Sequence, residues 1–178
     1  MSMSPTYRVV EADTPGQFAA ARILIEEYAA HIGAQFGVDL GFQNFAAELS
    51  HLHTMYGPPN GCLLLANRDV ENLEAQWVGC CALRRFSDGV CEMKRLYVRP
   101  EGRGARLGRL LADLLISKAR ALGYRRMVLD TIEDMIAARA LYRSLGFRDT
   151  EPYYFNPMAG VSYMELDLET ATNGVPRA

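Results

Sequence analysis

Residues 91–111 read CEMKRLYVRPEGRGARLGRLL: a strand, a glycine-rich turn and the start of a long helix. Pro100 has no N–H to give to a sheet, so the strand should end about there. Apolar residues then recur at helical spacing at Leu107, Leu110, Leu111, Leu114, Leu115, Ala119 and Leu122. A glycine-rich turn that enters a helix gathers free N–H groups at the positive end of the helix dipole. The stretch therefore predicts an anion site.

The turn also carries Arg103, Arg106 and Arg109, whose guanidinium groups favour phosphate. The alternative is an ordinary strand–turn–helix connection with basic surface residues. It is not a Walker loop, because no Gly-Lys-Ser/Thr follows, and it lacks the Gly-x-Gly-x-x-Gly order of dinucleotide folds.

Composition indicates one domain, expected over 1–169, with residues 170–178 as a frayed tail. The chain has 178 residues, 49% of them hydrophobic, and a net charge of −2, so no nucleic-acid partner is expected. The histidines and cysteines form no zinc pattern, and no metal is expected. Adjacent Cys80 and Cys81 point to opposite faces of a predicted strand. This arrangement indicates reduced, buried thiols, which are typical of a cytoplasmic protein. No apolar run spans a membrane, and the first residues lack a signal-peptide pattern.

The other elements follow from periodicity and punctuation. Thr14-Pro15-Gly16-Gln17 is typical of a capped helix start, and Phe18, Ala21, Ile25, Tyr28 and Ile32 form the apolar face of that helix. Further helices are predicted at 42–53 and 135–145, and strands at 6–12, 62–66, 75–86, 126–130, 147–150 and 162–168.

Residues 92–108 resemble the acyl-CoA-binding motif of the GNAT superfamily, the Gcn5-related N-acetyltransferases. The family pattern is Arg/Gln-x-x-Gly-x-Gly/Ala after a strand ending in an aliphatic-x-Val-x-Pro run. Arg103 fits the first position and Gly108 the last, but Arg106 replaces the middle glycine. Residues 138–147, ARALYRSLGF, are similar to the family's Leu-Tyr-x-x-x-Gly-Phe segment. Residues 42–43 and 152–154 also resemble a large uncharacterised bacterial group of this family.

The resemblance implies an α+β fold: one mixed, mostly antiparallel sheet, splayed in its centre, with helices on both faces. It also implies that pantetheine lies in the gap beside the central strand. Coenzyme A, expected as acetyl-CoA, would then be held by Leu96, Tyr97, Val98, Arg103, Gly104, Ala105, Arg106, Leu107, Gly108 and Arg109.

The reaction implied is direct acyl transfer to an amine, since no cysteine in the motif stands where a nucleophile is needed. Glu92 occupies the strand position of the general base in some members of the family; the alternative is a structural carboxylate paired with Lys94. Tyr142 matches the tyrosine that protonates the CoA sulfur, and its alternative is an apolar helix-face aromatic. A backbone N–H near Leu96 or Tyr97 would stabilise the carbonyl oxygen. Met135 stands where the family often has an asparagine that contacts CoA.

The acceptor, a small-molecule or peptide amine, is expected near 32–43 and 151–162 by fold analogy. The residues expected to bind it are Phe42, Gln43, Lys94, Arg95, Tyr153, Tyr154 and Asn156. Arg84 and Arg85 add positive charge on the neighbouring strand. This surplus favours an acceptor with a carboxylate, unless these cations reach solvent or pair with acids such as Asp88 and Glu133.

Two other function classes stay open from the sequence. A non-catalytic acyl-CoA-binding or sensing protein could use the same fold, although the presence of Glu92 and Tyr142 favours the enzyme. A nucleic-acid module would need a basic stripe beyond the phosphate turn. The sequence does not name the oligomeric state, and a homodimer is compatible with it.

Overall fold

The computed structural model of the protein describes residues 6–41, 44–69 and 76–169. Its elements are, in order, β1 (Thr6–Glu11), α1 (Pro15–Phe36), α2 (Phe45–Ser50), α3 (Leu52–Tyr56), β2 (Cys62–Asp69), β3 (Gln76–Ser87), β4 (Val90–Val98), the 3-10 turn η2 (Pro100–Gly102), α4 (Leu107–Ala121), β5 (Arg126–Ile132), α5 (Ile136–Ser144), β6 (Arg148–Asp149) and β7 (Val161–Asp167).

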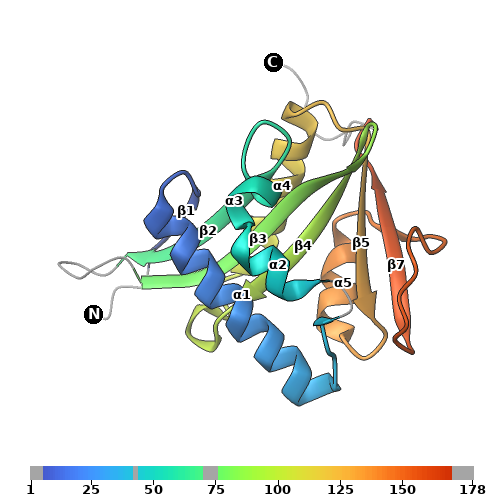
Figure 1. Cartoon of the computed structure of the whole chain (residues 1–178), viewed down its shortest axis with the longest axis horizontal. Helices are drawn as coiled ribbons and strands as arrows, with labels where there is room; N and C mark the ends of the chain where they lie inside the picture. Colours follow the sequence, from blue (N-terminus) through green and yellow to red (C-terminus); the bar gives the residue numbers. More distant parts are fainter. Residues whose placement is uncertain (1–5, 42–43, 70–75, 170–178) are drawn as a thin grey trace.

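The strands form one mixed sheet in the order β1-β2-β3-β4-β5-β7-β6, with helices on both faces (Figure 1). All neighbouring strands run antiparallel except β4 and β5. Helix α1 crosses the face turned toward the viewer, and α4 lies behind the sheet. The expected fold class is confirmed.

The sheet opens between β4 and β5. These strands pair only at Val90–Arg126, Cys91–Met127 and Glu92–Val128, although β4 continues to Val98 and β5 to Ile132. Beyond Glu92, β4 keeps its pairing with β3, and β5 keeps its pairing with β7. The sheet therefore divides into two halves that diverge from one point, as the resemblance implied.

A β-bulge in β4 accompanies this opening. Lys94 pairs with Ala82 and Tyr97 with Cys80, so two residues of β4, Arg95 and Leu96, stand opposite one residue of β3. Arg95 has φ +60°, which costs a residue with a Cβ free energy. A bulge of this kind bends its strand and increases the local twist, which here carries the end of β4 away from β5.

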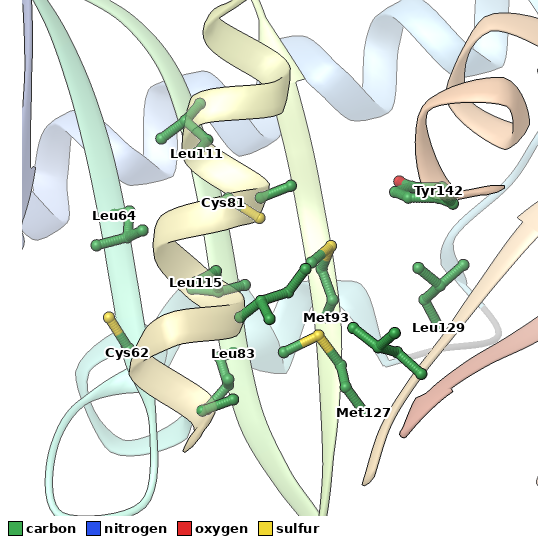
Figure 2. Packing of buried hydrophobic residues seen from close by; sticks show 14 of the residues in the cluster. Cys62, Leu64, Cys81, Leu83, Met93, Leu111, Leu115, Met127, Leu129 and Tyr142 are labelled. Carbon is green, nitrogen blue, oxygen red and sulfur yellow. The ribbon is translucent and has the colours of Figure 1, made fainter. Parts of the chain in front are cut away.

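Two hydrophobic clusters cover the two faces of the sheet. One packs β2–β5 and β7 against α4 and α5, and Figure 2 shows part of it. The other packs β2 and β3 against α1 and α3. Cys80 lies in the second cluster and Cys81 in the first, so adjacent cysteines do face opposite sides, and all four thiols are free and buried.

Helix α4 buries a narrower face than the sequence pattern predicted. Leu107, Leu111 and Leu115 are buried, but Leu110 and Leu114 are each 41% exposed, so the expectation that they face the core is wrong. The sheet meets the side of the helix that also carries Ala112, Ile116 and Ala119. Apolar spacing indicates a helix, but packing decides which edge of its apolar stripe is covered.

The other boundaries agree with expectation to within a few residues. The capping box at Thr14 is present, and α1 ends at Gly37 in the left-handed conformation. The single helix predicted at 42–53 is wrong, because His51, with φ −129°, ends α2 and precedes α3. The expected tail, 170–178, lies outside the described residues.

Candidate active site

Two connected hollows occupy the opening of the sheet. The larger, a groove of about 500 Å³, is lined by the end of β4, the turn that follows it, α1 and α5. The smaller, a cavity of about 50 Å³, lies deeper between β4, β5 and the segment after α1. Four residues line both hollows, which therefore meet at them: Tyr28, Leu96, Met135 and Tyr142.

The start of α4 forms one end of the groove. Its first intrahelical bond runs from the N–H of Leu110 to the carbonyl of Arg106, at 3.0 Å. The N–H groups of Leu107, Gly108 and Arg109 precede that bond and have no intrahelical acceptor. No side chain caps this end of the helix. The geometry is that of an anion site, as predicted from the turn.

The glycines of the turn leave room above the helix. Gly104 has φ +83°, a left-handed conformation that favours glycine. A Cβ on Gly108 would meet only Leu141 at 3.7 Å and Val98 at 4.0 Å, which are ordinary contacts. Arg106, which replaces the family's usual glycine, itself adopts the left-handed backbone with φ +57°. The substitution therefore keeps the turn geometry and adds a cation.

The other residues expected to hold CoA divide by position. Leu96, Tyr97, Val98, Arg103 and Gly108 line the groove. The Leu107 side chain is buried in the core, so only its backbone can reach a ligand. Ala105, Arg106 and Arg109 are exposed beside the groove without lining it.

Tyr142 projects from α5 toward the opening, opposite Met93 on β4 (Figure 2). Its side chain is 8% exposed and packs on Phe147. Among the residues that the structure describes, its hydroxyl has no hydrogen-bond partner. Burial raises the pKa of the Tyr142 phenol well above its usual value, and the neighbouring Tyr28 raises it further. The phenol is therefore protonated at neutral pH and is positioned to donate into the cavity.

Glu92 is fully enclosed and lines neither hollow. Its carboxylate accepts hydrogen bonds from Arg84 Nε at 2.7 Å and from the Tyr153 hydroxyl at 2.9 Å. Lys94 Nζ lies 3.6 Å from it. These contacts favour the alternative reading, a structural carboxylate, so its role as general base stays a prediction without geometric support.

The smaller cavity is lined by three of the seven residues expected to bind the acceptor. Lys94, Arg95 and Asn156 line it. The Tyr154 hydroxyl lies just behind, donating to Asp130 at 2.8 Å and accepting from Asn156 at 3.0 Å. The Tyr153 hydroxyl does not line the cavity and donates a hydrogen bond to Glu92. Phe42 and Gln43 lie outside the described residues.

Both segments expected to border the acceptor contribute residues to the smaller cavity. The cavity is lined on one side by Ile32, Val38 and Leu40, and on the other by Asn156 and Met158. The segment after α1 thus supplies apolar side chains, whereas the strands supply the charged ones, Lys94, Arg95 and Asp130, together with apolar ones.

The expected surplus of positive charge is wrong. Arg84 pairs with Glu92 at 2.7 Å, and Lys94 pairs with Asp130 at 3.3 Å. Arg95 donates to both carboxylate oxygens of Glu48, the Nε bond being 2.8 Å long. Arg85 lies 3.7 Å from Asp88, as the alternative expected. The counter-charges Glu48 and Asp130 come from distant parts of the chain, so the argument for an anionic acceptor loses its basis.

Asp130 and Tyr28 line the site but were not predicted for it. Burial alone would raise the pKa of Asp130, but Lys94 and the Tyr154 hydrogen bond outweigh it and lower that pKa. Asp130 is thus a carboxylate, and the only one among the described residues that line the smaller cavity. The sequence signal for both residues was their place: Tyr28 on the apolar face of a helix, Asp130 at the end of a strand.

A sheet that opens beside a glycine-rich turn with free helix N–H groups, with the Tyr142 phenol between, is the geometry of an acyl-CoA-dependent acyltransferase. Comparison with known proteins leads to the same class of enzyme. The sequence profile of the Acetyltransferase (GNAT) family matches residues 23–147, more than two-thirds of the chain. The protein belongs to the GNAT family and is an acyl-CoA-dependent N-acyltransferase.

Three individual proteins illustrate the relation. An uncharacterised N-acetyltransferase of Schizosaccharomyces pombe is 47% identical over 148 residues, which cover 83% of this chain and 86% of that protein. A GNAT acetyltransferase from Staphylococcus aureus Mu50 shares the fold with a TM-score of 0.73 at 20% identity, over 92% of this chain and all of the other. The structure of yncA from Salmonella typhimurium, solved with its cofactor acetyl-CoA, has a TM-score of 0.62 at 23% identity over 97% and 99% of the two chains.

In the described ranges, no helix combines the length and the apolar character needed to cross a bilayer.

Proposed function

We propose that the protein transfers the acetyl group of acetyl-CoA to the amine of a small-molecule or peptide acceptor, with the thioester at the junction of the two hollows. The observation that carries this proposal is that Tyr142 lines both the groove that begins at the phosphate turn and the smaller cavity. Donor and acceptor would enter from different sides and meet at its hydroxyl. The acetyl-CoA in the yncA structure supports the choice of donor.

The larger groove suits coenzyme A. The pyrophosphate would bind the open N–H groups of Leu107, Gly108 and Arg109, with Arg103 beside it. The pantetheine would follow the part of β4 that β5 leaves unpaired, where backbone groups are available for its amides.

The smaller cavity suits the acceptor. An amine arrives mostly as an ammonium ion. The Asp130 carboxylate, although paired with Lys94, would accept a hydrogen bond from it, while Ile32, Val38 and Leu40 would contact an apolar body. Attack requires the neutral amine, so the ammonium ion first loses one proton to solvent. The nitrogen then bonds to the carbonyl carbon, the C–S bond breaks, and its electron pair stays on sulfur. Tyr142 would give sulfur a proton, and the proton lost by nitrogen would restore the phenol.

Direct transfer fits the state of the cysteines. Burial raises the pKa of Cys80 to about 12 and that of Cys81 well above its usual value, so neither is a thiolate at neutral pH. None of the four cysteines lines either hollow. We also propose a cytoplasmic location, since all four thiols are free, as is typical of a reducing compartment.

The proposal is tested by release of free thiol from acetyl-CoA in the presence of amino acids, polyamines, aminoglycosides and peptides. Calorimetry with acetyl-CoA alone gives the binding step separately. We expect binding without an acceptor and thiol release with at least one class of amine. Absence of binding would refute the assignment of the donor; binding without thiol release across the panel would refute the assignment of the acceptors.

A further inference from the structure

Two phenols reach the junction of the hollows from opposite faces of the sheet. Tyr28 belongs to α1, which packs on the face that carries α3. Tyr142 belongs to α5 and lies in the cluster on the α4 face. A closed sheet would separate them, but β4 and β5 part beyond Glu92, so both side chains line the same space.

The hydroxyl groups of Tyr28 and Tyr142 are alike in their hydrogen bonding. Within the described part of the chain, neither has a hydrogen-bond partner. Tyr28 is half-buried, Tyr142 is 8% exposed, and neither hydroxyl is one of the fully enclosed polar atoms without a partner, so both can be reached from the hollows that their side chains line. Here both lie where a ligand has to enter, which indicates that the ligand supplies the partner.

Both phenols are donors at neutral pH. Burial raises the pKa of Tyr28 to about 12, although the nearby Arg95 opposes the shift. Tyr28 also contributes to the raised pKa of Tyr142, which places the two phenols within electrostatic reach of each other. The ring of Tyr28 is fixed by contact with Tyr97, at 6.1 Å between centroids.

We infer that Tyr28 is a second catalytic residue, whose hydroxyl donates a hydrogen bond to the carbonyl oxygen of the thioester as that oxygen gains charge. This inference rests on the proposed function. Tyr142 was matched to the sulfur, and sulfur and oxygen sit on the same carbon, so two donors on opposite sides of the gap can each serve one of them. Tyr28 keeps its proton throughout, so the proton balance of the transfer is unchanged.

Tyr28 would share its task with the backbone of β4. Leu96, which follows the bulge, lines the same junction, and its strand edge is unpaired toward β5. A side-chain donor beside a backbone donor completes a two-donor oxyanion site. Loss of one such donor typically lowers kcat about 10²–10³-fold.

The test uses Tyr28→Phe, which keeps the ring and its packing on Tyr97. Tyr7→Phe is the matched control, because its hydroxyl donates to the Glu101 carbonyl, away from both hollows. The first readout needs no acceptor: the infrared carbonyl band of acetyl-CoA labelled with ¹³C at the carbonyl carbon, bound to each protein. We expect a band at lower frequency in wild type and Tyr7→Phe than in solution, and a shift back toward the solution value in Tyr28→Phe.

The second readout is kcat with any acceptor found active, expected to fall about 10²–10³-fold in Tyr28→Phe at unchanged acetyl-CoA affinity. An unshifted carbonyl band in a folded Tyr28→Phe protein that binds acetyl-CoA would overturn the inference, whatever happens to kcat. Failure of wild type to bind acetyl-CoA would instead overturn the proposed function. The two failures are therefore distinguishable.

Discussion

Removing one partner of the ion pair between Glu48 and Arg95 should lower stability by an unusually large amount. Both side chains are 3% exposed. The guanidinium donates to both carboxylate oxygens, and the Tyr56 hydroxyl donates to the same carboxylate at 2.7 Å. The pair joins α2 to the bulge of β4. Glu48→Gln keeps the shape and one acceptor oxygen but leaves the buried Arg95 without its counter-charge.

The expected cost follows from this burial. Removing one partner of a buried pair costs about 3–5 kcal/mol, and the retained amide oxygen places Glu48→Gln near the lower end. For a chain of this size, 1 kcal/mol shifts Tm by about 2–4 °C, so Tm should fall by roughly 6–12 °C. The control is Glu26→Gln, whose pair with Arg22 has side chains 46% and 53% exposed. An exposed pair contributes at most about 1 kcal/mol.

Acid gives a second check on the same pair. Burial alone would raise the pKa of Glu48, but hydrogen bonds and charge from Arg95 outweigh it and lower that pKa in the folded protein. Its contribution is therefore complete above the unfolded value of about 4.3 and is lost as pH falls through the lower folded value. Urea unfolding at pH 7 and below pH 4 should show the gap between wild type and Glu48→Gln narrowing in acid. Equal losses in Glu48→Gln and Glu26→Gln, or a gap that widens in acid, would refute the reasoning.

Three further changes test the site. Gly108→Glu should weaken CoA binding at least about tenfold, because a carboxylate would face the pyrophosphate, with Tm near wild type since its Cβ meets only ordinary contacts; unchanged affinity by calorimetry contradicts this. Tyr142→Phe should lower kcat about 10²–10⁴-fold with CoA affinity retained. The loss should be the same at pH 6 and at pH 8, because the raised pKa of Tyr142 keeps the phenol protonated over this range; wild-type turnover in the variant would mean that Tyr142 is structural. Glu92→Gln should lower stability, because Arg84 and Lys94 lose a counter-charge, while the folded fraction keeps its turnover; a turnover loss that recovers at high pH would instead establish Glu92 as the base.

The phosphate end of the site was predictable because it is local. Gly104, Gly108 and the arginines between and beside them lie within a few residues, and the turn and the helix that follow are fixed by their own backbone preferences. The position of Tyr142 was equally readable, because its helix and the glycine that ends it form one short segment.

The acceptor end was much less predictable, because distant segments build it. Tyr28 and Asp130 are a hundred residues apart and meet only because the sheet opens between β4 and β5. The bulge that accompanies the opening has no sequence signature, since Arg95 is not a residue that favours a left-handed backbone. The pairing of Arg95 with Glu48 was hidden for the same reason, and this led to the wrong estimate of surplus charge.

The opening of the sheet also has a consequence for aggregation. Beyond Glu92, β4 carries a row of backbone groups that no strand of the sheet covers on the β5 side. An exposed edge of this kind is a template on which another chain can add a strand, and proteins usually block it with charge, proline or a short strand. Here the edge lies at the floor of a groove between α1 and α5, whose side chains flank it on both sides and leave little room for the strand of a second protein. A narrow, flexible ligand with amides of its own can still reach it. The position of this edge in a groove therefore leaves it accessible to a ligand while reducing the liability that such an edge carries on an open surface.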